Sequence, residues 1–252
     1  MKIKEVLNQK NAIYILTKLL NKDKTWLFLN DDLEVPKKYF EIQEKIKEGY
    51  PIEYLFKEVF FYGDRFYIDE GVLIPRDDTE IIVERAINLI NKIGNSKLKV
   101  VDCCSGSGVI AIEIAKHTKV KVIATDISDK AIEVAKINVK MHKVDVEVKK
   151  CDLFDIKADI LVANPPYVEN SWKKPNRFEP DIAFFGGEDG LDFVKKIILK
   201  AKDLNYKACV IEIGFNQKKS VDKFLKTIGI KNYEFFNDLA GNVRGVEILM
   251  KN

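Results

Sequence analysis

The run Asn164-Pro165-Pro166-Tyr167 indicates a more specific chemistry than any other segment of the sequence. It follows directly after the apolar segment 160–163. Its residue types supply a side-chain carbonyl, a backbone carbonyl with few competing conformers and a flat aromatic face. Two acceptors can hold both hydrogens of a planar NH2 group while the ring lies against its plane, so that the nitrogen lone pair faces an electrophile. The run therefore predicts a site for an amide or for the exocyclic amine of a base, although most such runs only end a strand and open a loop.

A second candidate site is a loop of small residues between an apolar strand-like segment and a helix start at Val109. The loop consists of Cys104, Ser105, Gly106, Ser107 and Gly108. Its two glycines allow the backbone to turn tightly and to approach a ligand closely. Position 111 is alanine where a dinucleotide-binding loop needs glycine, and position 109 is valine where a phosphate-binding P-loop needs lysine. The loop predicts a ligand site of another kind or, alternatively, a plain tight turn.

Two carboxylates are expected close to this loop. Asp126 ends the next predicted strand, where a ribose diol is commonly bound, although it could instead cap the helix that follows. Asp152 follows the third predicted strand, and Leu153 and Phe154 are expected to offer an apolar surface to an adenine ring. The three strand ends together predict a nucleoside site. A sulfonium cofactor fits this site better than NAD, because a transferable methyl group needs no phosphate-binding loop.

A doubly wound α/β fold would bring these sites together. Apolar runs alternate with amphipathic segments beyond residue 97, as in βαβ units. The predicted strands are 98–103, 120–125, 145–150, 159–163, 207–213, 231–237 and 244–250. The expected fold class is a seven-stranded, mainly parallel, Rossmann-like sheet covered on both faces. Ligands bind beyond the carboxyl ends of such strands, which is where Asn164 and the loop 104–108 would lie.

The first part of the chain has a different composition. Its apolar residues recur at helical spacing, and an aromatic, β-branched stretch around Gly63-Asp64 then predicts a hairpin turn. The predicted domains are a small helical domain at 1–49, a β-hairpin linker at 50–75 and the α/β domain at 76–252. The segment 25–29 is ambiguous between helix and strand. A capped helix is predicted to begin near Thr79, and its start would hold Arg76.

Length and composition set further limits. The chain has 252 residues and 46% hydrophobic content, and its net charge of +3 does not demand a nucleic-acid partner. No segment approaches the ~18 to 20 uninterrupted apolar residues of a membrane span, and the N-terminal segment lacks a signal peptide's apolar region. We therefore expect a cytoplasmic protein with no membrane partner and no stable nucleic-acid partner. The four cysteines have no metal-ligand spacing, so we expect reduced thiols and no metal.

The sequence resembles the HemK/PrmC family of release factor glutamine methyltransferases over nearly its whole length. The matching blocks are Gly49-Tyr50-Pro51 with Tyr54, Gly63, Phe66, Val72-Leu73-Ile74-Pro75-Arg76, Thr79-Glu80, the loop 102–108, Asp126, Asp152, the run 164–167, Phe178-Glu179-Pro180, Gly186-Gly187-Glu188-Asp189-Gly190-Leu191, Glu212-Ile213-Gly214 and Asp238-Leu239-Ala240-Gly241. The run 164–167 is shared with other amino-group methyltransferases. The blocks around Arg76 and Gly186 are more selective.

This resemblance implies methyl transfer from S-adenosylmethionine to the side-chain amide nitrogen (N5) of the glutamine in the Gly-Gly-Gln loop of class 1 peptide chain release factors. It implies that the helical domain helps to hold the release factor. The implied cofactor-binding residues are 104–108, Asp126, Asp152, Leu153 and Asn164. The implied substrate-binding residues are Asn164, Pro165, Pro166, Tyr167 and Arg76, with Asn164, Pro165 and Tyr167 catalytic.

The sequence departs from the family pattern at a few positions. Cys104 stands where the family usually has the first glycine of its loop, and Lys57 stands where a glycine is common before the hairpin. Asp77-Asp78 replaces the usual proline-containing pair. None of these changes removes a group that the chemistry needs. His117 and His142 are expected in surface roles, so the transfer is expected to depend on geometry and electrostatics rather than on a strong base.

Two other functions remain open from the sequence. An N6-adenine methyltransferase acting on DNA or RNA would present the same NH2 geometry once the base is flipped out. The near-neutral charge and the short helical head argue against it. A module that binds S-adenosylmethionine without catalysis, and uses the helical head as an interaction surface, belongs to a different class. Measurable cofactor binding without methyl transfer would favour that module.

Overall fold

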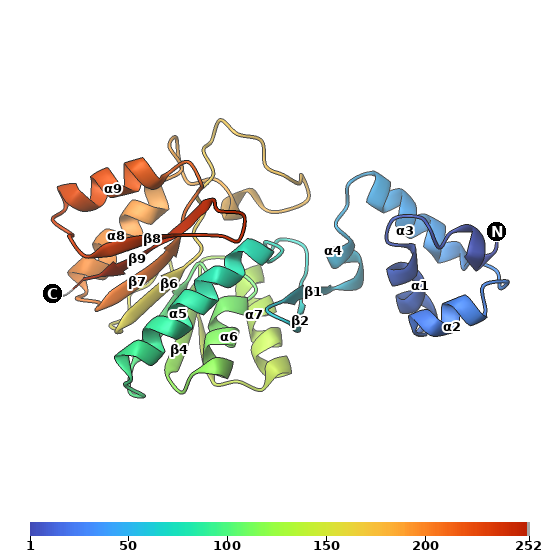
Figure 1. Cartoon of the computed structure of the whole chain (residues 1–252), viewed down its shortest axis with the longest axis horizontal. Helices are drawn as coiled ribbons and strands as arrows, with labels where there is room; N and C mark the ends of the chain where they lie inside the picture. The colour runs from blue at the N-terminus through green and yellow to red at the C-terminus, as the bar shows by residue number, and fades with distance from the viewer. Residues whose placement is uncertain (251–252) are drawn as a thin grey trace. The chain divides into compact units, whose positions relative to one another are not determined.

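The computed structural model describes residues 1–250, and the chain divides into two compact units (Figure 1). The first unit comprises residues 1–57 and the second begins at Glu58. Each unit has its own hydrophobic core. Across residues 1–250, no helix combines the length and the apolar composition that a membrane span requires.

The first unit is helical. Its elements are the 3-10 helix η1 (Ile3–Glu5) and the helices α1 (Ala12–Leu20), α2 (Lys24–Leu29), α3 (Lys37–Lys47) and α4 (Ile52–Phe56). The ambiguous segment 25–29 belongs to α2, because Asp23 caps this helix by accepting a hydrogen bond from the Trp26 backbone N–H at 2.7 Å. Ile52 and Phe56 of α4 pack against the core of the first unit. The unit therefore extends to Lys57.

The second unit opens with a β-hairpin. Strands β1 (Glu58–Phe61) and β2 (Asp64–Tyr67) pair antiparallel. The turn residues are Tyr62 and Gly63, with φ values of +53° and +83°, as a two-residue hairpin turn of this kind requires. The turn therefore lies one position before the predicted pair Gly63-Asp64, because Asp64 already pairs with Phe61.

A seven-stranded sheet forms the centre of the second unit. Its strands are β3 (Lys99–Cys103), β4 (Lys121–Asp126), β5 (Val146–Lys150), β6 (Ile160–Ala163), β7 (Ala208–Glu212), β8 (Tyr233–Asn237) and β9 (Val243–Leu249). Their order is β5-β4-β3-β6-β7-β9-β8, and β9 runs antiparallel to both of its neighbours, β7 and β8. The predicted fold class, a mainly parallel seven-stranded α/β sheet, is confirmed.

Helices cover both faces of this sheet (Figure 1). They are α5 (Glu80–Ile93), α6 (Val109–His117), α7 (Asp129–His142), α8 (Asp192–Asp203) and α9 (Lys218–Thr227). Val101 and Cys103 of β3 share one core cluster with apolar residues of α8 and α9, whereas the alternate residues Val100 and Asp102 point to the other face. Residues on both faces are buried, which explains the continuous apolar runs of the strands.

The strand order reverses between β3 and β6. From β3 the chain proceeds through β4 to β5 on one side, and it then returns to place β6 on the other side of β3. Cys103 of β3 lies opposite Ala163 of β6 in the parallel register. Cys104 and Asn164 are the next residues of the two strands, so both begin loops at the switch point where such sheets bind ligands.

Candidate active site

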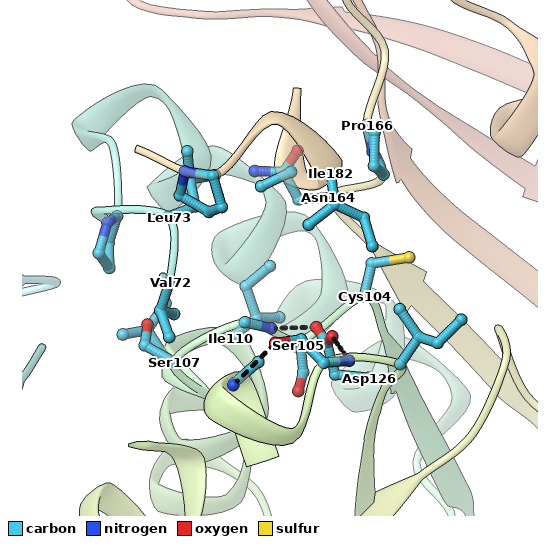
Figure 2. A pocket seen from close by; sticks show the side chains of 18 of the residues that line it. Val72, Leu73, Cys104, Ser105, Ser107, Ile110, Asp126, Asn164, Pro166 and Ile182 are labelled. Carbon is cyan, nitrogen blue, oxygen red and sulfur yellow. Dashed lines mark hydrogen bonds between the residues drawn. The ribbon is translucent and has the colours of Figure 1, made fainter. Parts of the chain in front are cut away.

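A cavity that is partly open to solvent lies at this switch point (Figure 2). The predicted site residues that line it are Arg76, Cys104, Ser105, Gly106, Ser107, Asp126, Asp152, Leu153, Asn164 and Pro166. Gly108, Pro165 and Tyr167 are not part of its lining. In Figure 2 the side chains of Asn164 and Pro166 lie on the opposite side of the cavity from Asp126.

The loop 104–108 turns sharply at its first residue. Cys104 has a φ of +60°, in the left-handed region that favours glycine, and Gly106 and Gly108 have φ values of +55° and +82°. A Cβ at Gly108 would lie 3.2 Å from the Cβ of Ala135 on α7, so this glycine also permits close helix packing. The cysteine at 104 thus accepts a backbone conformation that costs a side-chain-bearing residue about 1–2 kcal/mol.

Asp126 connects the end of β4 to this loop. Its Oδ2 accepts a hydrogen bond from the Gly106 N–H at 2.9 Å, and its Oδ1 accepts one from the Ser128 N–H at 2.9 Å. Burial raises the pKa of the carboxyl, and the backbone amides of Ser128, Gly106 and Ile127 act against that rise. The alternative role as the cap of α7 is wrong, because Ser128 is the N-cap and its Oγ accepts from the Ala131 N–H. Each Asp126 oxygen retains a lone pair for a ligand hydroxyl.

The segment after β5 brings Asp152 and Leu153 to the cavity. Thr125 connects this segment to the loop 104–108, a role that the sequence did not predict. The Thr125 hydroxyl donates a hydrogen bond to the Leu153 carbonyl at 2.6 Å, and the Thr125 carbonyl accepts one from the Ser105 N–H at 3.0 Å. The expectation for Phe154 is wrong. Its ring is fully buried and packs edge-on against Tyr206 at 5.5 Å, so it contributes to the core and not to the cavity.

Asn164 presents its side-chain amide at the end of β6. Its Nδ2 donates a hydrogen bond to Thr79 Oγ1 at 3.1 Å, and both residues line the cavity. Thr79 is buried at the start of α5, after the 3-10 helix η2 (Asp77–Thr79), and its side chain makes no helix-capping bond. The helix start was predicted correctly, but the capping role of the hydroxyl is wrong because that hydroxyl is engaged by Asn164.

The hydroxyl of Tyr167 is bound by a buried carboxylate. The O–H donates to Glu212 Oε1 at 2.9 Å, and Glu212 is buried at the carboxyl end of β7. Burial raises the pKa of Glu212 to about 7, and burial together with the Glu212 charge raises the pKa of Tyr167. Sequence reasoning assigned Glu212 no role of its own, although a carboxylate that ends a strand predicted to be buried is an informative signal.

Arg76 lines the cavity and is held by an ion pair. Its Nη2 lies 2.6 Å from Glu179 Oε2, and Glu179 Oε1 accepts a hydrogen bond from the Ile74 N–H at 3.0 Å. Glu179 is buried, so one carboxylate fixes both the Arg76 side chain and the backbone before it. Sequence reasoning matched Glu179 only as part of a block and did not identify this connection.

The backbone of the glycine-rich loop 186–191 packs closely against the backbone of the run 164–167. A Cβ on Gly186 would overlap the Pro166 carbonyl oxygen, and a Cβ on Gly190 would overlap the Tyr167 carbonyl oxygen. Gln217 Nε2 also donates to the Tyr167 carbonyl at 2.9 Å. These glycines are therefore required for the close approach of two backbones, and Gly190 also has a φ of +68°.

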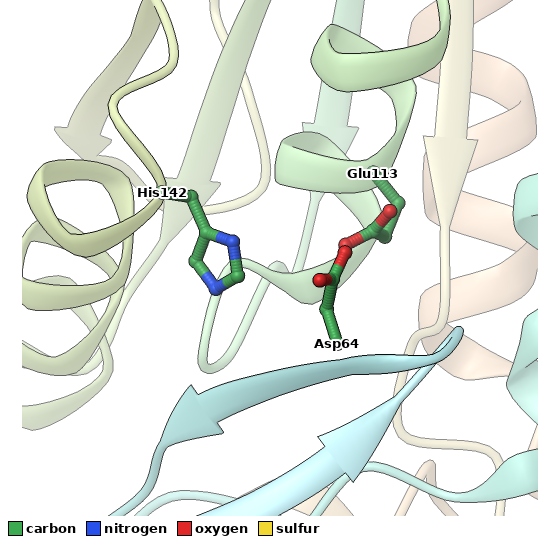
Figure 3. Close-up of side chains that lie close together, drawn as sticks. All are labelled: Asp64, Glu113 and His142. Atoms are coloured by element: carbon green, nitrogen blue, oxygen red, sulfur yellow. The ribbon is translucent and has the colours of Figure 1, made fainter.

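Among residues 1–250, one group of side chains has the spacing of a metal site, and it lies outside the cavity (Figure 3). Asp64 comes from β2, Glu113 from α6 and His142 from the end of α7. Lys116 Nζ contacts the carboxylates of both Asp64 and Glu113, so two of the three groups are already paired with an ammonium group. Burial raises the pKa of Glu113 to about 7.

Comparisons with known proteins agree with this arrangement. Residues 85–179 match the family described as "Methyltransferase small domain". The chain is 37% identical, over 90% of its length and 86% of the relative, to "Release factor glutamine methyltransferase" of Clostridium acetobutylicum. It is 34% identical to the protein of the same name from Mycoplasma mycoides subsp. mycoides SC, over 92% of the chain and 89% of the relative.

A solved structure has the same fold at low sequence identity. The N-terminal domain of human METTL16 in complex with SAH superposes with a TM-score of 0.56, at 17% identity, over 74% of this chain and 76% of that chain. At this identity the likeness concerns the fold alone. The family is shown by the relatives from Clostridium acetobutylicum and Mycoplasma mycoides subsp. mycoides SC.

Proposed function

The chain belongs to the family of release factor glutamine methyltransferases, and we propose that it methylates the side-chain amide nitrogen (N5) of the glutamine in the Gly-Gly-Gln loop of class 1 release factors. The methyl donor in this proposal is S-adenosylmethionine. The observation that carries the site is the orientation of the Asn164 amide, whose Nδ2 is bound by Thr79 so that Oδ1 can serve as an acceptor in the cavity.

The cavity residues fit a nucleoside with a sulfonium group. Asp126 has two oxygens that each accept one backbone N–H and can each accept a ribose hydroxyl as well. Ile127 and Leu153 supply an apolar surface for the adenine in place of the buried Phe154. When bound, the cofactor would supply an electrophilic methyl group. No lysine or arginine lies in the loop 104–108, in keeping with a ligand that carries no phosphate.

The chain's own contribution to the reaction is the placement of the glutamine amide. Asn164 Oδ1 and the Pro165 carbonyl oxygen would accept the two N–H bonds of that amide and aim its nitrogen at the methyl group. The Tyr167 ring would pack along the amide plane. Positive charge develops on the nitrogen during transfer, so both acceptors bind the transition state more strongly than the substrate. One amide proton then leaves to water, which restores a neutral amide.

The helical unit is proposed to hold the body of the release factor. Within that unit, Phe28, Leu29 and Leu33 are large apolar side chains with 50%, 80% and 48% of their surface exposed. Exposed apolar side chains close together in sequence are suited to a protein partner. This assignment also agrees with the separate core of the unit, which can fold around its own buried residues.

The direct test uses methyl-labelled S-adenosylmethionine with the protein and its own release factor, followed by peptide mapping by mass spectrometry. The expected result is one labelled methyl group on the glutamine of the Gly-Gly-Gln loop and no label when that glutamine is replaced by alanine. A DNA duplex and a structured RNA serve as parallel substrates. Label on adenine, or cofactor binding without transfer to any of these substrates, would overturn the proposal.

A further inference from the structure

The backbone of the run 164–167 offers few groups by which the rest of the protein can hold it. Pro165 and Pro166 have no N–H to donate, and in the proposed reaction the Pro165 carbonyl must stay available to the substrate amide. Asn164 is fixed at one end of the run, because it directly follows the last residue of β6 that pairs with β3. The other end of the run therefore has to be fixed through Tyr167.

Gln217 binds the Tyr167 carbonyl from the turn between β7 and α9. The residue is only 4% exposed, and its Nε2 donates to the Tyr167 carbonyl oxygen at 2.9 Å and to the Asp189 carbonyl oxygen at 3.2 Å. Its Oε1 accepts a hydrogen bond from the Gly214 N–H at 2.8 Å. One buried side-chain amide therefore joins the run 164–167, the glycine-rich loop 186–191 and the turn that follows β7.

The partners of this amide determine which chemical group can occupy position 217. A backbone N–H can only donate and a backbone carbonyl can only accept, so Oε1 must face Gly214 and Nε2 must face the two carbonyls. The surroundings are close: a Cβ at Gly190 would lie 2.6 Å from Gln217 Nε2, and a Cβ at Gly214 would lie 3.2 Å from Gln217 Cδ. The site thus requires one acceptor and two donors on a single planar group, which is the set that a carboxamide carries.

We propose that Gln217 is a positioning residue of the methyl transfer: it fixes the Tyr167 carbonyl and, through it, the two acceptors that would receive the substrate NH2 group. This inference rests on the proposed function, because it concerns the same reaction. Those acceptors, Asn164 Oδ1 and the Pro165 carbonyl, are joined to Tyr167 by a segment with two ring-locked φ angles, which absorbs little displacement. A shift of about 1 Å in groups that orient a substrate can cost ~100-fold in rate. Gln217 is not among the residues that line the cavity, so it acts through the run 164–167.

The test uses two variants of Gln217. Gln217→Met has a side chain of similar length and removes both donors and the acceptor. Gln217→Glu keeps an acceptor for the Gly214 N–H but cannot supply two donors, because an ionised carboxyl group has none and a neutral one has one. Single-turnover methylation of the release factor is measured with enzyme and cofactor at saturating concentration, and cofactor affinity is measured separately. We expect both variants to lower the saturated rate by ~10-fold to 100-fold, with cofactor affinity within about 2-fold of wild type.

Tyr206→Phe is the matched control for a loss of stability. Tyr206 is buried and does not line the cavity, and its hydroxyl donates to the Ile156 carbonyl at 2.6 Å. This variant also leaves a backbone carbonyl without its donor, so its melting temperature should fall while its saturated rate stays within about 2-fold of wild type. A purely structural role of Gln217 would give this same result for the two Gln217 variants.

The outcomes separate the inference from the proposed function. A saturated rate within about 2-fold of wild type in either folded Gln217 variant, or a loss confined to cofactor affinity, would overturn the inference. An equal loss of rate in Tyr206→Phe would overturn it as well, because the rate would then follow stability. If one of the two Gln217 variants does not fold, the other decides the outcome. A wild-type protein that does not methylate the release factor would instead overturn the proposed function.

Discussion

Replacing Asn164 by alanine separates the two parts of the proposed mechanism, the placement of the substrate and the binding of the cofactor. The variant loses one preorganised acceptor, which is worth ~10²–10³ in rate, or about 2.7–4 kcal/mol of transition-state stabilisation. It also loses the 3.1 Å hydrogen bond to Thr79. A bond of that kind contributes about 0.5–1.5 kcal/mol to folding, so the melting temperature should fall by only a few degrees. Cofactor affinity should change little, because Asp126 and the loop 104–108 remain.

The assay is single-turnover methyl transfer with enzyme in excess over release factor, with cofactor affinity measured separately by calorimetry. Asn91→Ala, on the exposed end of α5 outside the cavity, is the matched control and should behave as wild type. A wild-type transfer rate in Asn164→Ala would refute the role of the amide. So would a variant whose slow rate recovers fully when cofactor is raised to saturation, because that result would assign Asn164 to cofactor binding.

Three further results are expected. Gly is favoured over Ala at a positive φ, so Cys104→Gly should be more stable to urea than Cys104→Ala by about 0.5–1 kcal/mol, and a less stable glycine variant would contradict the +60° backbone. Gly190→Ala would force the Tyr167 carbonyl to move and should reduce the transfer rate at least ~10-fold, which the same single-turnover assay measures against wild type. Folding raises the pKa of Glu113 from 4.5 to about 7, so the folded state binds more protons than the unfolded chain between these values, and stability should fall as pH rises through that window. Melting curves from pH 4.5 to 8 should show a weaker fall in Glu113→Gln, and an unchanged slope would contradict the raised pKa.

The architecture could be predicted from the sequence because its signals are local. The strands of a parallel sheet are buried on both faces, so each is an apolar run that needs no knowledge of its partners, and the order of runs and amphipathic segments then implies the fold. The position of Asn164 beside Cys104 also follows, since both residues come directly after neighbouring parallel strands. Two positions that require a positive φ could also be identified from the sequence. Cys104 and Lys57, the two positions where a glycine was expected, both have a φ near +60°.

The details that failed depend on contacts between distant segments. Thr79 has the residue type and the position of a helix cap, but its hydroxyl is engaged by Asn164, which lies far away in the sequence. Phe154 follows two cavity residues, yet its ring is fully buried against Tyr206. Adjacent residues separate in this way because one of them, Leu153, has a φ of +60° and turns the chain. No local pattern specifies such a choice.

Burial of a carboxylate does not by itself indicate a part in the reaction, as the two glutamates with a raised pKa illustrate. Glu113 and Glu212 are equally buried, and removal of either charge from water is unfavourable. Glu113 is neutralised by Lys116, and its neighbours Asp64 and His142 lie outside the cavity. Glu212 instead accepts a hydrogen bond from Tyr167, which follows the cavity residues Asn164 and Pro166 in the chain. An apolar residue at 212 would avoid the cost of burial, but it would leave the Tyr167 hydroxyl without an acceptor. The unfavourable carboxylate is therefore explained by the hydrogen bond with which it holds the Tyr167 hydroxyl.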